Sequence, residues 1–217
     1  MSLEFIVHGA KGTGSVAVEA ALTLLGLLYR VEEAPSLADR AAADAFALVN
    51  PMRQVPALIL PSGELMTESA AILIWLADAH PTGGLAPPID SRRRPAFLRW
   101  MTFVSAAVYS LYWIRDDPSR LVDDEPNQAL LRRRIDDRIS ACWTIMESQV
   151  APDPYLLGPD PTVLDLYLTV LSRWEPHRRA FYDAAPRMGE VVRRVDADPR
   201  LAGLWAARFP FVEGWEG

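Results

Sequence analysis

Glycines and hydroxyl side chains gather near the start of the chain, where the sequence changes from a strand pattern to a helix pattern. Gly9, Gly12 and Gly14 follow an apolar run, and Thr13 and Ser15 lie among them. A strand that turns into a helix N-terminus presents backbone N–H groups and the positive end of the helix dipole. This stretch therefore predicts an anion site, for either the phosphate of a dinucleotide or the thiolate of a thiol substrate.

Each anion has support in the residues around the turn. The spacing Gly12-x-Gly14-x-x-Ala17 matches a dinucleotide fingerprint, and Glu32 or Glu33 follows where a ribose-binding acid would stand. For a thiol, Thr13 or Ser15 offers a hydroxyl at the start of the helix. Lys11, the only lysine of the chain, lies in the same loop and would favour either anion.

The first 80 residues predict alternating strands and helices that end in a hairpin. Apolar runs, helical spacing and Gly or Pro breaks give this order: strand Phe5–Val7, helix from Ser15 to Leu25, strand Leu28–Glu33, helix Ser36–Val49, strand Ala57–Leu60, strand Glu64–Met66, and a helix from Ser69 through Leu76. We expect Ser15 to cap the first helix. A doubly wound dinucleotide domain needs more parallel strands than about 80 residues supply, which disfavours the dinucleotide hypothesis.

The remainder of the chain predicts helices only. A Gly- and Pro-rich linker covers 81–89, and apolar residues then recur at helical spacing over 97–111, 131–150 and 162–174. Shorter helices are expected near 187–195 and 199–208. The predicted organisation is therefore a mixed α/β domain at 1–80 and an all-helical domain at 90–217.

Composition excludes several functional classes. The chain has 217 residues, half of them apolar, and a net charge of −6, which argues against nucleic acid or an acidic membrane as partner. Cys142 is the only cysteine, so no internal disulfide forms. The start of the chain lacks a signal-peptide pattern and the apolar runs are short, so we expect a cytoplasmic protein. His8, His80 and His177 lack metal-ligand spacing, and no metal is expected.

Three local patterns carry a resemblance to a known family. They are the segment from Asn50 to Leu58 (NPMRQVPAL), the pair Glu68-Ser69 at a helix start, and the capping box Thr162-Val163-Leu164-Asp165. With the order of elements, they resemble the cytosolic glutathione S-transferases. The resemblance implies a thioredoxin-like N-terminal domain (βαβ-α-ββα), an all-helical C-terminal domain and a homodimer.

The resemblance also implies where glutathione binds. It places the cysteinyl backbone of glutathione on Val55, before a cis Val55–Pro56 bond, with Gln54 adjacent. It places the γ-glutamyl end on Glu68 and Ser69. An N–H and a hydroxyl at a helix N-terminus suit a carboxylate, and the Glu68 carboxylate suits an ammonium group. Lys11 is expected to favour the same ligand.

The chain departs from the family at the thiol. Gly12 stands where related enzymes have an activating serine, and Gly14 where others have a cysteine. The first loop contains no tyrosine and lacks the serine–serine–cysteine–serine pattern of the zeta-like isomerases. Thr13 and Ser15 remain as catalytic candidates, with Thr13 expected to donate to the thiol and Ser15 to cap the helix.

The resemblance implies a glutathione S-transferase-like enzyme that activates glutathione, its co-substrate, for attack on an apolar electrophile. The electrophile should bind between the domains, on Tyr109, Tyr112, Trp113, Arg115 and Trp174. Three alternatives remain open: a glutathione-dependent peroxidase or disulfide reductase, a catalytically weak module that binds glutathione or a protein partner, and a dinucleotide-dependent enzyme.

Overall fold

The N-terminal domain is a four-stranded mixed sheet covered by helices. In the computed structural model, which describes residues 4–35 and 40–211, the strands lie in the order β2-β1-β3-β4. Their bounds are β1 Phe5–Gly9, β2 Tyr29–Glu33, β3 Ala57–Ile59 and β4 Leu65–Thr67. β1 pairs with β2 in parallel, whereas β1–β3 and β3–β4 are antiparallel. This thioredoxin-like topology confirms the predicted fold and is not the parallel sheet that a dinucleotide domain requires.

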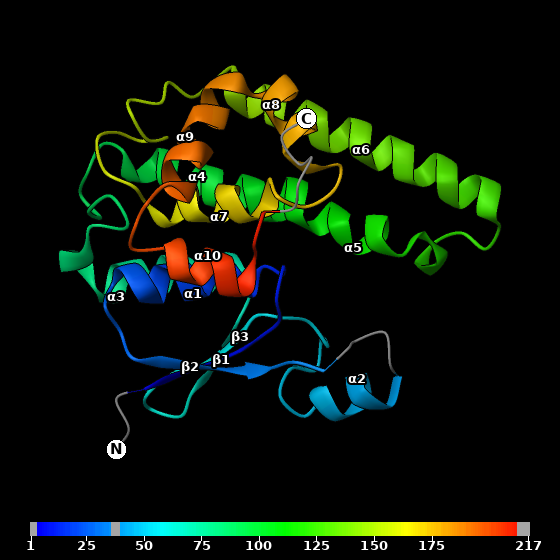
Figure 1. Cartoon of the computed structure of the whole chain (residues 1–217), viewed down its shortest axis with the longest axis horizontal. Helices are drawn as coiled ribbons and strands as arrows, with labels where there is room; N and C mark the ends of the chain where they lie inside the picture. Colours follow the sequence, from blue (N-terminus) through cyan, green and yellow to red (C-terminus); the bar gives the residue numbers. More distant parts are fainter. Residues whose placement is uncertain (1–3, 36–39, 212–217) are drawn as a thin grey trace.

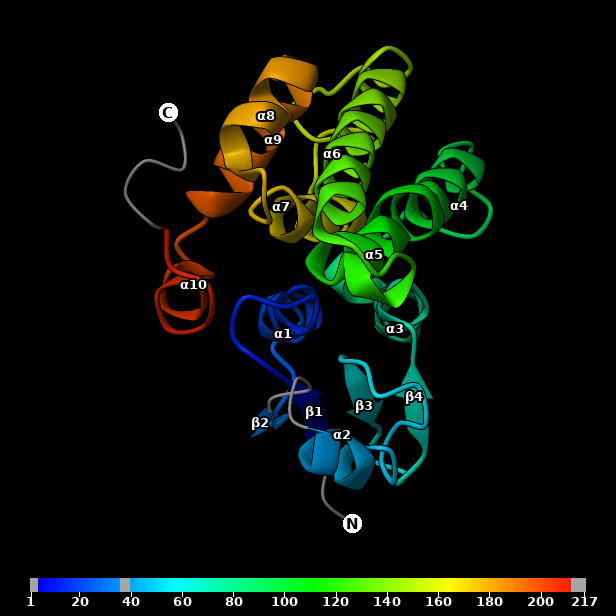
Figure 2. The same ribbon diagram turned by 90° about the vertical axis from the view of Figure 1, so that its right-hand side faces the viewer.

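Two helices separate the sheet from the rest of the molecule. These are α1 (Ser15–Leu24) and α3 (Ser69–Ala79), and Figure 2 shows both between the strands and the C-terminal helices. Helix α2 (Arg40–Phe46) lies on the other side of the sheet, where the Phe46 ring is 6.1 Å from that of His8 (Figure 1). It is shorter than the predicted helix at 36–49, of which residues 36–39 lie outside the described residues.

The C-terminal region is mostly helical. After a 3₁₀ turn at Pro81–Gly83 come α4 (Arg94–Phe103), a π-helical segment (Val104–Tyr109), α5 (Ser110–Asp116), a second 3₁₀ turn (Pro118–Arg120), α6 (Glu125–Glu147), α7 (Val163–Leu171), α8 (His177–Ala184), α9 (Pro186–Asp196) and α10 (Ala202–Arg208). The structure differs from the expected helices in two places. Helix α8 was not predicted, and α7 ends at Leu171, so Trp174 follows the helix instead of closing it.

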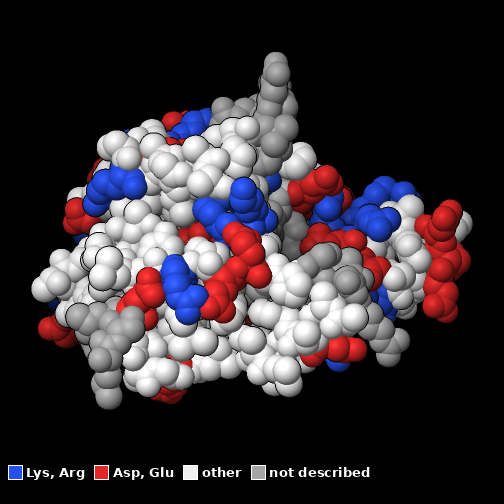
Figure 3. Space-filling model, turned by 60° about the horizontal axis from the view of Figure 1, so that its bottom comes forward, with Lys and Arg blue, Asp and Glu red and all other residues white. Residues whose placement is uncertain are grey.

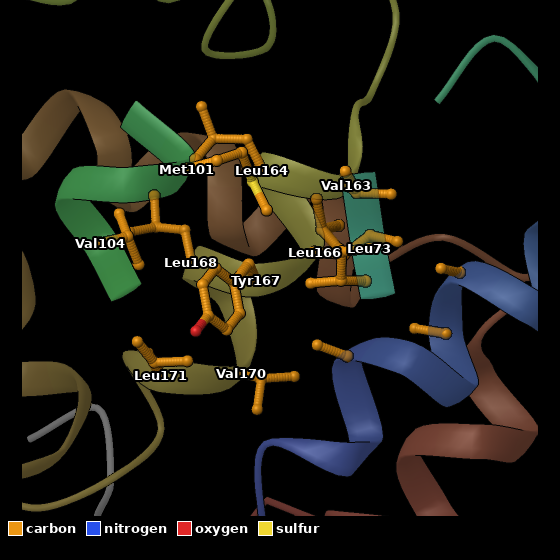
Figure 4. Packing of buried hydrophobic residues seen from close by; sticks show 14 of the residues in the cluster. Leu73, Met101, Val104, Val163, Leu164, Leu166, Tyr167, Leu168, Val170 and Leu171 are labelled. Atoms are coloured by element: carbon orange, nitrogen blue, oxygen red, sulfur yellow. The ribbon is translucent and has the colours of Figure 1, made fainter. Parts of the chain in front are cut away.

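Helix α7 forms the centre of the molecule. All nine of its residues are buried, and it packs against α1, α3, α4 and α9. Figure 4 shows its side chains meeting Met101, Val104 and Leu73. Fully burying such a side chain stabilises the fold by roughly 1.5–3 kcal/mol.

The predicted capping box at the start of α7 is confirmed. The Asp165 carboxylate accepts hydrogen bonds from the Thr162 N–H at 2.7 Å and from the Thr162 hydroxyl at 2.8 Å. It also accepts the Leu156 N–H at 2.9 Å, and so ties the preceding loop to the helix.

Charged side chains are distributed in mixed groups. On the face shown in Figure 3, basic and acidic residues lie beside one another. None of the described helices has the length and apolarity needed to cross a bilayer.

Candidate active site

A cleft of about 1340 Å³ opens between the N-terminal domain and the C-terminal helices. One wall comes from the Gly12–Gly14 turn, the loop before β3 and the start of α3. The other comes from the π-helical segment, α5 and the loop after α7. Eleven of the residues predicted for the site line this cleft: Thr13, Gln54, Val55, Pro56, Glu68, Ser69, Tyr109, Tyr112, Trp113, Arg115 and Trp174.

Two predicted residues lie elsewhere. Lys11 is exposed and does not line the cleft. Ser15 is completely buried, and the prediction that it caps α1 was wrong. Gly14 is the N-cap and Ser15 is the first helical residue. The Ser15 hydroxyl contacts the Ala10 backbone at 3.2 Å and lies 3.2 Å from the Glu19 carboxylate.

The Gly12–Gly14 turn is held by hydrogen bonds from both sides. Gly12 adopts a left-handed φ of 71°, which glycine tolerates. Its N–H donates to the Arg208 carbonyl at 2.9 Å, and its own carbonyl accepts the Trp174 indole N–H at 2.7 Å. The Thr13 hydroxyl donates to the Ala10 carbonyl at 2.8 Å and lies 2.9 Å from the Ser15 hydroxyl. The hydroxyls that were predicted to serve the thiol are therefore engaged within the loop.

The loop before β3 is shaped by Asn50. Its buried side chain donates to the Gln54 carbonyl at 2.7 Å and accepts the Met52 N–H at 3.0 Å. These bonds close the loop into a compact turn whose far end is the Val55–Pro56 peptide. That peptide is cis, as predicted, and both of its residues line the cleft.

Glu68 and Ser69 begin α3 at the cleft. Glu68 has a φ of 65°, a left-handed conformation that non-glycine residues seldom adopt and that tends to occur at functional sites. The buried Ser69 hydroxyl lies 2.8 Å from the Tyr167 hydroxyl of α7. The start of α3 is thus fixed against the central helix of the C-terminal region.

Aromatic rings cluster on the facing wall. The Trp174 ring contacts Tyr109 and Tyr112 edge to face, with centroids 4.9 and 4.8 Å apart. Burial raises the pKa of both tyrosines above the ordinary value, so both phenols stay protonated. Trp113 is 46% exposed and lies under the Arg120 guanidinium.

The outer part of this wall is more polar than the sequence predicted. Arg115 is not free, because it pairs with Asp136 at 2.6 Å and with Glu175 at 3.3 Å. Charged residues that were not predicted also line the cleft: Asp116, Arg120, Arg132 and Glu175, which are exposed, and Arg173, which is buried. An apolar electrophile would contact the aromatic rings and lie beside these charges.

A buried ion pair behind the turn was also missed. Glu19 is fully buried in α1 and accepts from the Arg208 Nε at 2.7 Å, while Arg208 also pairs with Glu33. The signal in the sequence was a single glutamate within the apolar helix SVAVEAALTL, since a buried charge requires a partner. The sequence does not indicate that its partner is Arg208, which lies 189 positions away.

Cys142, the single cysteine of the chain, lies in the helical core. Cys142 is buried, as predicted, and its Sγ lies 3.4 Å from the Ala107 carbonyl. Burial raises the pKa of this thiol, which makes it a poor nucleophile. In residues 4–35 and 40–211 no group of three His, Cys, Asp or Glu side chains could hold a metal ion.

Known proteins are similar to this chain in fold and in sequence. A family model described as the glutathione S-transferase N-terminal domain matches residues 15–79. The uncharacterized GST-like protein YncG of Escherichia coli K12 is 31% identical over 196 residues, which is 90% of this chain and 94% of that protein. A glutathione transferase homologue from Sulfitobacter, solved with bound glutathione, superposes with a TM-score of 0.82 at 24% identity, over 95% of this chain and 99% of its own.

A sphingomonad glutathione S-transferase complexed with glutathione has a TM-score of 0.77 at 26% identity, over 94% of this chain and 98% of its own. Fold and cleft together define a protein of the glutathione transferase type. With the identity and coverage above, the chain belongs to the glutathione S-transferase family.

Proposed function

We propose that this protein is a glutathione transferase that activates the glutathione thiol for attack on an apolar electrophile. The observation that carries the proposal is that one cleft is lined by both the expected glutathione-binding residues and the aromatic residues. Val55, Glu68 and the Gly12–Gly14 turn form one wall, and the aromatic side chains of the C-terminal region face them. Glutathione and an apolar electrophile would thus lie against each other in one site.

Each end of glutathione has a matching group. Glu68 suits the ammonium of the γ-glutamyl end, and Ser69 at the start of α3 suits its carboxylate. The backbone of Val55 suits the cysteinyl amide, with Gln54 beside it. Bound this way, glutathione would extend its thiol toward the turn that begins α1.

The reaction forms one carbon–sulfur bond. A free thiol has a pKa near 8.5, so the site must favour loss of its proton to solvent. A lone pair of the thiolate sulfur then bonds to the electrophilic carbon, and the leaving group departs with its bonding pair. The protein contributes thiol activation and proximity, because it holds both reactants in one cleft.

One alternative reaction is disfavoured and one alternative function remains. A glutathione-dependent disulfide reductase that also needs a protein thiol is disfavoured, because the chain's single cysteine, Cys142, is buried. A glutathione-binding module without catalysis is favoured by Gly12 and Gly14, which stand where the family has activating side chains.

We further propose a cytoplasmic homodimer, as family membership implies, and light scattering on the purified protein tests the dimer.

Steady-state kinetics test the proposed reaction. We expect glutathione to be consumed one for one with an activated aryl halide, and Glu68→Gln to raise the KM for glutathione. Organic hydroperoxide in place of the aryl halide tests the peroxidase alternative. Saturable glutathione binding without turnover of either compound would favour the binding module.

A further inference from the structure

The Tyr109 hydroxyl occupies the space of a side chain at position 14. A Cβ added to Gly14 would overlap the phenol oxygen and lie 2.8 Å from the Tyr109 Cζ, closer than real Cβ atoms approach. Gly14 has an ordinary helical φ of −61°, so the backbone conformation does not call for glycine, but any side chain at this position would displace the phenol. A hydroxyl from the C-terminal region therefore stands at the N-cap of α1.

The other donors of the turn are already used. The N–H groups of Gly12, Thr13 and Ser15 donate to the Arg208 carbonyl, the Ala10 carbonyl and the Thr13 hydroxyl. The Thr13 hydroxyl donates to the Ala10 carbonyl. The anion site expected from free backbone N–H groups is therefore largely closed.

Tyr109 provides the remaining donor. Its phenol oxygen accepts a hydrogen bond from the Gly14 N–H, so the helix terminus polarises the hydroxyl. Within the part of the chain that the structure describes, we find no acceptor for the phenol proton. Tyr109 is half-buried and lines the cleft, so the proton can reach a bound ligand.

The phenol is also held in place and kept neutral. Its ring packs against Trp174 and, at a centroid distance of 5.9 Å, against Tyr167. Burial, with the nearby Tyr167, Glu68 and Asp116, raises its pKa. A fixed neutral phenol is a preorganised hydrogen-bond donor.

We propose that Tyr109 is the catalytic hydroxyl of this site and donates its hydrogen bond to the glutathione sulfur. The assignment rests on the proposed function. It places the thiol-activating group on the C-terminal region and replaces the sequence-based choice of Thr13. It also accounts for Gly14, because a cysteine or serine there would collide with the phenol.

The test is the pKa of the bound glutathione thiol, measured from the ultraviolet absorbance of the thiolate. In the wild type we expect a value below the free-thiol pKa of about 8.5. Tyr109→Phe should return it to about the free value and lower kcat/KM at neutral pH by roughly tenfold, less than the ~10²-fold loss at fully enclosed sites. Tyr155→Phe, which removes a phenol hydroxyl away from the cleft, should change neither quantity.

A second variant tests the same geometry without removing the tyrosine. Gly14→Ala displaces the phenol and should raise the thiol pKa as Tyr109→Phe does. Gly203→Ala is its control, since a Cβ there meets nothing within 4 Å. Two results would overturn the assignment: an unchanged thiol pKa in Tyr109→Phe, or a rise caused by Thr13→Val instead. Failure of the wild type to bind glutathione in calorimetry would overturn the proposed function as well.

Discussion

The indole N–H of Trp174 donates to the carbonyl of Gly12 at 2.7 Å, which joins the loop after α7 to the turn before α1. Within the residues described, this bond and the Gly12 N–H bond to Arg208 hold the turn from the C-terminal region. The geometry of the proposed thiol site is therefore set by residues more than 160 positions apart.

Trp174→Phe should weaken glutathione binding as well as the fold. The substitution keeps an aromatic ring but leaves the Gly12 carbonyl without its donor, at a cost of about 1–3 kcal/mol. We expect a several-fold rise in the Kd for glutathione, measured by calorimetry. Trp100→Phe, in the core away from the cleft, is the control and should lower only the melting temperature. Equal glutathione affinity in wild type and Trp174→Phe would show that the bond does not support the site.

Glu19→Gln should change how stability depends on pH. Burial raises the pKa of Glu19 above its ordinary value of 4.5, and the hydrogen bonds from Arg208 and Ser15 only partly oppose the rise. The folded chain then holds this proton more tightly than the unfolded chain. The stabilisation is complete below the ordinary pKa and is lost as pH rises through the raised value. The wild type should therefore lose stability relative to Glu19→Gln, by up to about 1.4 kcal/mol per pH unit within that window.

Urea unfolding at a series of pH values measures this difference. Glu33→Gln is the matched control, because Glu33 pairs with the same Arg208 but its side chain is 55% exposed. The Glu33→Gln variant should still lose stability as pH rises, because Glu19 remains buried. If the Glu19→Gln curve runs parallel to that of the wild type, Glu19 does not titrate with a raised pKa.

Asp165→Ala should be among the most destabilising single substitutions. It removes the acceptor of the Leu156 N–H, the Thr162 N–H and the Thr162 hydroxyl, all buried. Each orphaned donor costs about 1–3 kcal/mol, so we expect a loss of at least 3 kcal/mol in urea unfolding. Asp160→Ala, exposed in the same loop, should stay within about 0.5 kcal/mol of the wild type. A loss below 1 kcal/mol for Asp165→Ala would contradict the role of the capping box.

Much of the fold could be predicted because its signals are local. Apolar runs bounded by Gly or Pro marked the strands and α1, and the segment around Val55–Pro56 marked the entry to β3. Helix α8 was missed because the sequence HRRAFYDA has no apolar stripe; of its residues, Arg178 and Phe181 are buried. Arg178 pairs with Asp196 of α9, a tertiary contact that no local pattern reports.

The sequence predicts most of the residues that line the cleft, but not which hydroxyl is free to donate to a ligand. Eleven of the residues predicted from motifs or from their place in the expected fold line the cleft. Whether a hydroxyl is free depends on its partners, and the engagement of Thr13 by Ala10 is visible only in three dimensions. The approach of Tyr109 to Gly14 joins residues distant in sequence, so only its effect, a glycine at position 14, appears in the sequence.

Glutathione binding in this cleft is the central claim, and thermal unfolding with added ligand measures it most directly. At about 100 times its Kd, reduced glutathione should stabilise the wild type by about 2.7 kcal/mol. The shift should shrink in a Glu68→Gln, Ser69→Ala double variant and persist in Ser62→Ala, an exposed serine of the β3–β4 turn. No shift with glutathione, together with a shift by NAD(P), would contradict the account.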